Sequence, residues 1–189
     1  MRIIAGDAKG TKLRSPKGLK LRPTSERVRG AIFGILGSMP RQPQRVLDLY
    51  SGTGALGIEA LSRGAEWVDF VERDAGACAI IRQNLASAGF ADRSHVYCSN
   101  VSKALGFLSQ PYDLILADPP YLKTSPGELL TRLSRSPLLG EDTTVIFEES
   151  SQGEVAESAG DLRLVKTRRY GDTLVAIYHR KPVLESEEE

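Results

Sequence analysis

Hydrophobic residues follow two alternating patterns from about residue 45 onward. Short apolar runs, typical of buried strands, alternate with stretches in which apolar residues recur every three or four positions, typical of helices. The short runs predict strands at residues 45–50, 67–71, 94–98, 112–117 and 143–147. The longer stretches predict helices at residues 55–63, 75–88 and 101–108, and a further helix that contains residues 128–133.

This alternation predicts an α/β fold. Strands that alternate with helices form a parallel sheet with helices on both faces. Two further strands, residues 162–169 and 173–180, flank Gly171-Asp172 and are typical of a hairpin. The hairpin adds an antiparallel strand to a mostly parallel sheet.

The first forty residues have a different pattern. Arg2–Ala5 and Lys12–Arg14 are short segments that we expect to pair as a small hairpin. Thr24 or Ser25 is then the expected N-cap of a helix. Arg27 and Arg29 are predicted to lie off the apolar face of this helix, which is formed by Val28, Ile32, Ile35 and Leu36.

Length and composition fit one main domain with an appendage. The chain has 189 residues, of which 41% are hydrophobic and 26% charged. We predict a basic extension at residues 1–40, the main domain at 41–181 and a disordered acidic tail at 182–189. No run approaches the ~20 apolar residues that span a membrane, and the first ten residues lack a signal-peptide core. With two isolated cysteines, these features indicate a cytoplasmic protein.

Charge is distributed unevenly along the chain. Residues 1–30 contain nine Lys and Arg residues but only two acids, Asp7 and Glu26, so this segment carries +7 while the remainder carries −6. A basic segment on a mildly acidic body favours a polyanionic partner such as nucleic acid. A solvated, flexible arm is the alternative.

A glycine-rich turn follows the first predicted strand. Gly52-Thr-Gly54-Ala-Leu-Gly57 is a literal GxGxxG motif, which fits a nicotinamide dinucleotide and also a purely structural turn. Asp48 ends the strand just before it, and a carboxylate there suits a cationic ligand such as S-adenosylmethionine. Glu72 lies where an acid accepts ribose hydroxyls from either cofactor, and Asn100 is placed to pair with an adenine or to form a turn.

A proline-rich turn follows the fourth predicted strand and gives the sharpest chemical signal. In Asp118-Pro-Pro-Tyr121 the two prolines fix the backbone and remove two N–H donors. The Asp118 carboxylate and the Pro119 carbonyl are then two rigid acceptors for the two N–H bonds of an amine. Tyr121 offers a face on which a base can stack. Guanine presents adjacent donors that a carboxylate accepts, so the turn favours guanine slightly over adenine.

Two other kinds of site do not fit the sequence. A cytosine-C5 methyltransferase needs a cysteine nucleophile, typically after proline, but Cys78 follows Ala77 and Cys98 follows Tyr97. His95 and His179 lie in strand-like segments without metal-ligand spacing. We therefore predict no metal site.

These motifs resemble those of the RsmD-type family, the bacterial 16S rRNA guanine-N2 methyltransferases. The resemblance covers roughly Met1 to Arg180. It rests on Arg2-Ile-Ile-Ala-Gly6, Lys12-Leu13, Arg22-Pro-Thr24, Arg27-Val-Arg29, the stretch from Asp48 to Ala65, Asp118-Pro-Pro-Tyr121 and Tyr170-Gly-Asp-Thr173. The family often has Glu and Asn where this chain has Gly30 and Gly34, and many related enzymes have Asp at position 100.

The resemblance implies a Rossmann-like class I methyltransferase fold whose seven-stranded sheet has one antiparallel strand. It implies that S-adenosylmethionine, with S-adenosylhomocysteine as product, binds at Asp48, Ser51, Gly52, Thr53, Gly54, Ala55, Glu72, Arg73, Asn100 and Val101. The guanine would be held by Asp118, Pro119 and Tyr121. A monomer would bind 16S rRNA, or a small-subunit assembly particle, through Arg2, Lys9, Lys12, Arg14, Arg22 and Arg27.

Three other functions remain open. A DNA adenine-N6 methyltransferase uses the same turn, although such enzymes usually carry an added recognition domain. A NAD-dependent oxidoreductase would explain the glycines and Glu72, but it gives no role to Asp118 or to the basic segment. A non-catalytic RNA-binding protein on the same fold is the third alternative.

Overall fold

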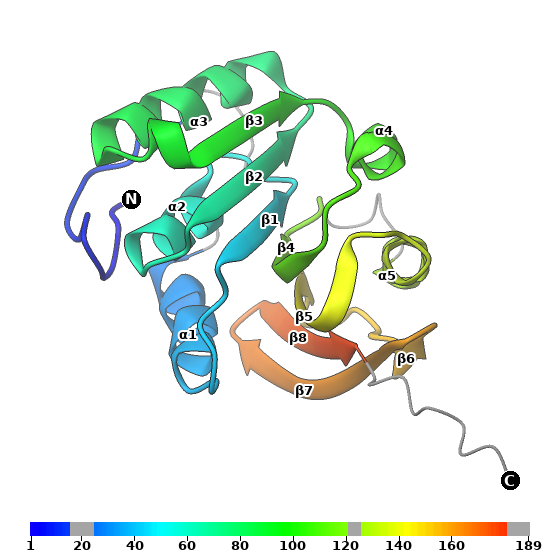
Figure 1. Ribbon diagram of the computed structural model, residues 1–189. Coiled ribbons are helices and arrows are strands. Elements are labelled where there is room, and N and C mark those ends of the chain that lie inside the picture. Colours follow the sequence, from blue (N-terminus) through cyan, green and yellow to red (C-terminus); the bar gives the residue numbers. More distant parts are fainter. Residues whose placement is uncertain (16–24, 121–125, 181–189) are drawn as a thin grey trace, which may run out of the picture.

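One sheet of eight strands, in the order β3-β2-β1-β4-β5-β8-β7-β6, forms the centre of the computed structural model (Figure 1). The structure describes residues 1–15, 25–120 and 126–180. The strands are β1 (Arg45–Leu49), β2 (Trp67–Glu72), β3 (Ser94–Cys98), β4 (Tyr112–Ala117), β5 (Leu139–Ser150), β6 (Ser158–Ala159), β7 (Leu162–Tyr170) and β8 (Thr173–Arg180).

The pairing of the strands confirms the predicted α/β class. Strands β1 to β5 pair in parallel, whereas β8 pairs antiparallel with both β5 and β7. All seven predicted strands are present, and the two-residue β6 is an addition that is too short to leave a pattern in the sequence. Strand β5 is longer than the predicted residues 143–147, because Leu139 pairs with Tyr112 and residues 148–150 pair with β8.

Helix α1 begins after Ser25, one of its two expected N-caps, whereas α2 begins after Gly54 without a side-chain cap. Ser25 caps α1 by accepting a hydrogen bond from the Val28 amide, and Asp74 caps α3 in the same way. No helix among the described residues is long and apolar enough to cross a membrane. The helices are α1 (Glu26–Gly37), α2 (Ala55–Ser62), α3 (Ala75–Ala88), α4 (Val101–Phe107) and α5 (Pro126–Ser134), with a short 3-10 turn at Ala91–Arg93.

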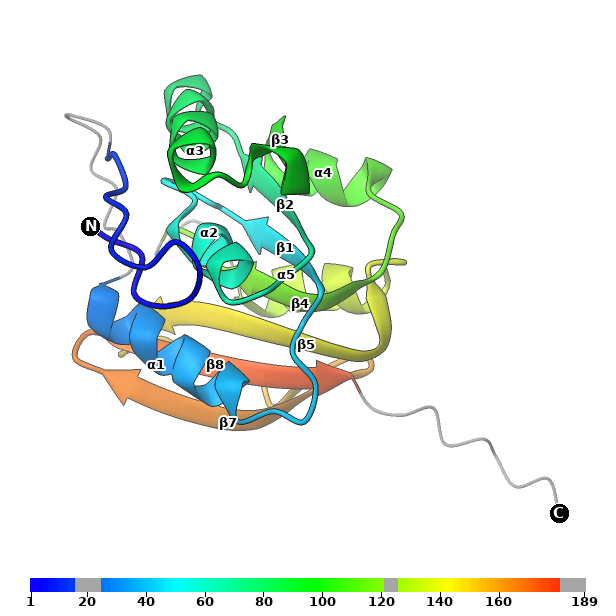
Figure 2. The same cartoon turned by 60° about the vertical axis from the view of Figure 1, so that its left-hand side comes forward.

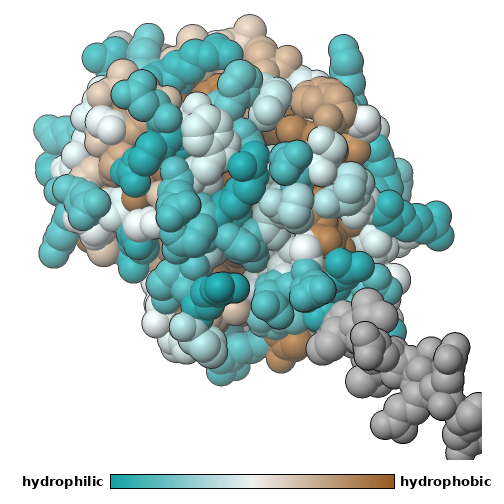
Figure 3. Space-filling view, in the orientation of Figure 1, coloured by the Kyte–Doolittle hydropathy of each residue, from teal (hydrophilic) through white to brown (hydrophobic). Residues whose placement is uncertain are grey.

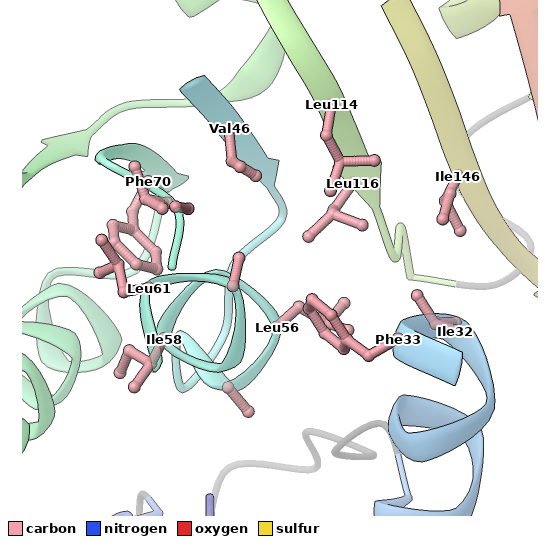
Figure 4. Close-up of a cluster of buried hydrophobic side chains, with 14 of the residues drawn as sticks. Ile32, Phe33, Val46, Leu56, Ile58, Leu61, Phe70, Leu114, Leu116 and Ile146 are labelled. Atoms are coloured by element: carbon pink, nitrogen blue, oxygen red, sulfur yellow. The ribbon is translucent and has the colours of Figure 1, made fainter. Parts of the chain in front are cut away.

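A hydrophobic cluster lies on each face of the sheet. One joins α1, α2 and α3 to the sheet, and the other joins α4 and α5 to the opposite face. In Figure 4, Phe33 of α1 meets Leu56 of α2 beneath Leu116 and Ile146 of two central strands. Helix α1 is therefore part of the main core. Burial of its apolar side chains contributes to the stability of the whole domain.

The N-terminal segment, residues 1–15, is bound to α2 and α3. Its predicted hairpin is present as a single bridge between Arg2 and Lys12. The buried Glu59 of α2 accepts hydrogen bonds from the backbone amides of Ile4 and Ala5, at 2.8 and 3.0 Å. Figure 2 shows the segment lying beside α2. The described part of the predicted arm is thus held in place by side chains of the main domain.

One prediction for this region is wrong. Arg29 was expected to lie off the apolar face of α1, but its side chain is completely buried. Its Nε lies 3.6 Å from a carboxylate oxygen of Glu59, and its Nη2 donates to the Arg2 carbonyl. Burial lowers the pKa of Arg29, whereas the charge of Glu59 opposes this shift. Arg29 is therefore a structural ion-pair partner, and it contributes no charge to the surface.

Candidate active site

The chain turns sharply between β1 and α2, at the glycine motif. Tyr50, Gly52 and Gly54 have positive φ angles of 58°, 55° and 76°. This region of backbone space costs a residue with a side chain about 1–2 kcal/mol, so it favours glycine. The Ser51 hydroxyl fixes the turn by donating to the Asp48 carbonyl at 2.6 Å.

The third glycine of the motif has a packing role. A Cβ atom on Gly57 would lie 2.4 Å from the Phe70 ring and 2.9 Å from Val68. Helix α2 therefore approaches β2 more closely than any side chain at this position would allow. As a result, the first turn of α2 lies directly over the end of β1.

Asp48 is a buried carboxylate that lacks a cationic partner among the described residues. It is 1% exposed and accepts one hydrogen bond, at 2.9 Å, from the Gly57 amide. Burial, opposed by that hydrogen bond and aided by the negative charges of Asp118 and Glu72, raises the pKa of Asp48 to about 7. The site therefore favours a ligand with positive charge.

Glu72 ends β2 beside the glycine turn, as predicted. Its two carboxylate oxygens accept the amides of Gly52 and Asp74, each at 2.9 Å. These bonds fix the orientation of the carboxylate, and each oxygen keeps a second lone pair. The side chain can thus accept two hydroxyl groups from a ligand at the rim of the turn.

Asn100 follows β3 and has a structural role that the sequence left open. Its Oδ1 accepts the Lys103 amide at 2.7 Å, so the side chain caps α4. Of the neighbouring candidates, Val101 is buried in the first turn of α4, whereas Arg73 is exposed after β2. Capping uses one lone pair of the amide oxygen. The second lone pair and the N–H2 group of the side chain can therefore bind a ligand.

The proline turn lies next to the glycine turn because β4 pairs directly with β1. Asp118 comes one residue after the register pair Leu49–Ala117. It is half-buried, Pro119 is buried and Pro120 is exposed. In addition to burial, the negative charge of Asp118 raises the pKa of Asp48, so the two carboxylates lie close enough to interact. Tyr121 lies outside the described residues.

The predicted RNA-binding residues that the structure describes come from the N-terminal segment and from α1. Within the described segments they are exposed at the surface, and Arg14 also donates to the Gln83 side chain on α3 at 3.1 Å. Arg22 lies outside the described residues. The exposed members are Arg2, Lys9, Lys12, Arg14 and Arg27.

Sequence reasoning missed Asn84, which connects the N-terminal segment to the glycine turn. This fully buried amide on α3 accepts from the Arg14 amide at 2.8 Å, and donates to the carbonyls of Arg14 and Thr53 at 3.1 and 3.0 Å. A polar residue on the same helical face as Ile81 and Leu85 was the available signal. Asn84 therefore positions two candidate binding elements relative to each other.

A hollow of about 570 Å³ lies at the opposite edge of the sheet, near the start of β4. Its lining includes Met39, Asp113 and His179, and none of the candidate ligand-binding residues. Its size does not make it the better candidate, because the uncompensated carboxylate and the strained turn lie at the other edge. Ligands of open α/β sheets bind at that other, carboxyl-terminal edge.

Comparison with protein families gives one match across most of the chain. The family model described as "Conserved hypothetical protein 95" matches residues 1–179. A protein of Bacillus subtilis named "Putative rRNA methyltransferase YlbH" is 36% identical over 184 residues, which cover 96% of this chain and 100% of that protein.

An Escherichia coli protein gives a similar result. It is named "Ribosomal RNA small subunit methyltransferase D", is 29% identical over 187 residues, and is matched over 93% of its length and 99% of this chain. Among solved structures, one titled "Putative methyltransferase yhhF from Escherichia coli" superposes with a TM-score of 0.82 at 29% identity, covering 96% of this chain and 98% of that one. The fold is thus a Rossmann-like class I methyltransferase fold.

Proposed function

The chain belongs to the RsmD-type methyltransferase family, and from this premise we propose that it methylates small-subunit ribosomal RNA. The cofactor is S-adenosylmethionine and the product is S-adenosylhomocysteine. The methyl group goes to the exocyclic N2 amine of one guanine in 16S rRNA. The substrate is the rRNA itself or a small-subunit assembly particle, and the enzyme acts in the cytoplasm as a monomer.

One observation carries this proposal: three carboxylates surround the two turns. Asp48 is buried with a raised pKa, Glu72 is fixed by two backbone amides, and Asp118 lies close enough to influence Asp48. A nicotinamide dinucleotide would bring an anionic pyrophosphate into this negative field. S-adenosylmethionine brings an ammonium and a sulfonium, so its charge fits the site.

We assign the cofactor contacts by this charge and by the backbone. Asp48 would hold the cationic part of the cofactor, and Glu72 would accept the ribose hydroxyls. Asn100 would contact the adenine with the groups that capping leaves available. The remaining contacts would come from Ser51, Gly52, Thr53, Gly54, Ala55, Arg73 and Val101.

The proline turn would hold the amine. The Asp118 carboxylate and the Pro119 carbonyl would each accept one N–H bond, which directs the nitrogen lone pair toward the reacting carbon. When bound, S-adenosylmethionine supplies an electrophilic methyl group on a positively charged sulfur. Methylation makes the nitrogen's proton acidic, and the Asp118 carboxylate would accept it. Tyr121 would stack on a base that has left its helix.

The exposed cations of the N-terminal segment and α1 would contact the RNA backbone. Phosphate contacts from Lys and Arg supply most of the salt-dependent affinity of nucleic-acid binding proteins. Glu59 and Asn84 bind the backbone of this segment to α2 and α3, and Asn84 holds Arg14 near the glycine turn. The assigned residues are Arg2, Lys9, Lys12, Arg14, Arg22 and Arg27.

A methyl-transfer assay with the Asp118→Ala variant tests the proposal. We expect the rate of transfer to fall about 10²–10³-fold or more, because the amine loses one of its acceptors. The affinity for S-adenosylhomocysteine, measured by calorimetry, stays within about twofold, since Asp118 is assigned to the base. The Asp142→Ala variant is the matched control, because it removes an exposed acid at the opposite edge of the sheet.

Labelled S-adenosylmethionine is offered separately with small-subunit particles, naked rRNA and DNA, and the products are digested to nucleosides. Labelled 2-methylguanosine from rRNA or particles is the expected result. Methyladenine from DNA would instead identify a DNA adenine methyltransferase, and absence of transfer to all three would indicate a binding protein. Equal loss of transfer and cofactor affinity in Asp118→Ala would overturn the role of Asp118.

A further inference from the structure

Strand β7 carries a run of positive charge to which no role has been assigned. Residues 162–171 include four cations and no acid. Lys166, Arg168 and Arg169 are exposed and form no ion pair within the described ranges, whereas Arg163 at the other end of the strand donates to backbone carbonyls. Free cations on a surface raise the local concentration of polyanions.

Sheet register places the charged end of β7 at the active edge. Ala117 pairs with Phe147, so Asp118 and Glu148 are the next neighbours along the same two strands. Glu148 pairs with Val175, and Val175 pairs with Arg168. Asp118 and Arg168 therefore lie in one row, three strand spacings or about 14 Å apart.

Two of these cations lie on the same sheet face as Asp118. Lys166 and Arg168 pair with Ile177 and Val175, which belong to the hydrophobic cluster beneath α1. Leu116 belongs to that cluster too, and Asp118 follows it by two residues, which in a strand means the same face. Arg169 has the opposite parity and lies on the other face.

Protection of an exposed sheet edge is the simpler explanation for charge on β7. Strand β6 covers only Leu162 and Arg163, and charged side chains on open edges prevent pairing with other chains. Edge protection, however, requires neither one sign of charge nor a cluster at one end. Here the charge is all positive, and three of the four cations lie in the half of β7 nearest the active edge.

We propose that Lys166 and Arg168 form a second RNA-binding surface, which contacts the phosphate backbone of the substrate. This proposal rests on the proposed function. The N-terminal segment binds to α2 and α3, over β1 to β3, whereas β7 lies on the other side of β4 and β5. The RNA would thus be held on both sides of the target base. Figure 3 shows a face that is mostly hydrophilic, with small scattered hydrophobic patches.

The test measures binding of full-length protein to 16S rRNA at salt concentrations from about 50 to 200 mM. The variant is Lys166→Gln/Arg168→Gln. The matched control is Arg41→Gln/Arg135→Gln, which removes two exposed cations outside the active edge. Losing two phosphate contacts should lower the slope of log K against log salt by about 1.4 and weaken binding at least tenfold. Affinity for S-adenosylhomocysteine should not change.

Three results would overturn the proposal. A salt slope equal to that of the control would remove β7 from the interface, and self-association of the variant with normal RNA binding would assign the cations to edge protection. A loss of slope in Arg169→Gln equal to the loss per cation in the double variant would contradict the assigned face. If the wild-type protein neither binds nor methylates rRNA, the proposed function itself fails, which is distinct from each of these results.

Discussion

Two buried aspartates on neighbouring strands have opposite surroundings. Asp69 of β2 is 2% exposed and accepts hydrogen bonds from Tyr112 at 2.7 Å, Trp67 at 2.9 Å and Arg45 at 3.3 Å. Asp48 of β1 is equally buried, but it accepts one backbone amide and faces other carboxylates. The fold therefore satisfies one acid completely and leaves the other in need of positive charge.

We use this difference to distinguish structural acids from an acid that we propose binds a ligand. An unpaired buried charge is costly, so the group either takes up a proton through a raised pKa or is compensated by a ligand from outside the chain. Glu59 belongs with Asp69, because it accepts two backbone amides and contacts both Arg29 and Arg63. The three acids predict a graded series of responses to substitution.

Removal of the best-satisfied acid should have the largest effect on stability. The Glu59→Ala variant leaves Arg29 buried without its charge partner and detaches the amides of Ile4 and Ala5. We expect the free energy of unfolding to fall by about 3–5 kcal/mol, measured by urea denaturation. Glu66→Ala, at an exposed acid in the next loop, is the control. A loss below about 1 kcal/mol would show that Glu59 is not a structural anchor.

Glu59 also shows what the sequence leaves undetermined. The strands, the glycine turn and the proline turn were predictable, because periodicity and the backbone restrictions of Gly and Pro are local properties. The burial of Arg29 was not, because its partner lies thirty residues away on α2. Its position in a charge-rich segment pointed instead to the surface.

The candidate site also contains residues that local sequence patterns predict and residues that they do not. Asp48, Glu72 and Asp118 were placed correctly at one edge, since strand ends of a parallel sheet meet there. Asn100 could not be assigned, because an Asn after a strand serves equally as an N-cap or as a ligand contact. Asn84 required knowledge of tertiary contacts between α3, Arg14 and Thr53.

An intermediate effect is expected for Asp69→Asn. The amide has one oxygen where the carboxylate had two, so at least one of the donors from Tyr112, Trp67 and Arg45 loses its partner. We expect a loss of about 1–3 kcal/mol in unfolding free energy with unchanged affinity for S-adenosylhomocysteine. Asp92→Asn, at an exposed position, is the control. A fall in cofactor affinity would show that Asp69 is not a purely structural acid.

An effect on stability of opposite sign is expected for Asp48→Asn. The amide oxygen still accepts the Gly57 amide, while the charge that opposes Asp118 and Glu72 disappears. We expect the variant to be more stable than the wild type above neutral pH, by up to about 4 kcal/mol, which corresponds to raising a carboxyl pKa from 3.8 to about 7. Its affinity for S-adenosylmethionine should nevertheless fall about tenfold or more, because a charge-assisted contact is lost.

The pH dependence gives this last prediction its sign. The pKa of Asp48 is raised from its ordinary value of 3.8 to about 7 in the folded protein, so between these values the folded state binds more protons than the unfolded state. The free energy of unfolding of the wild type therefore falls as pH rises through this window, and levels off above it. The Asp48→Asn variant lacks this component, so the stability difference between the two proteins should grow from pH 4 to pH 7. Denaturation curves at several pH values measure it, and a difference independent of pH would mean that Asp48 is compensated within the chain, as Asp69 is.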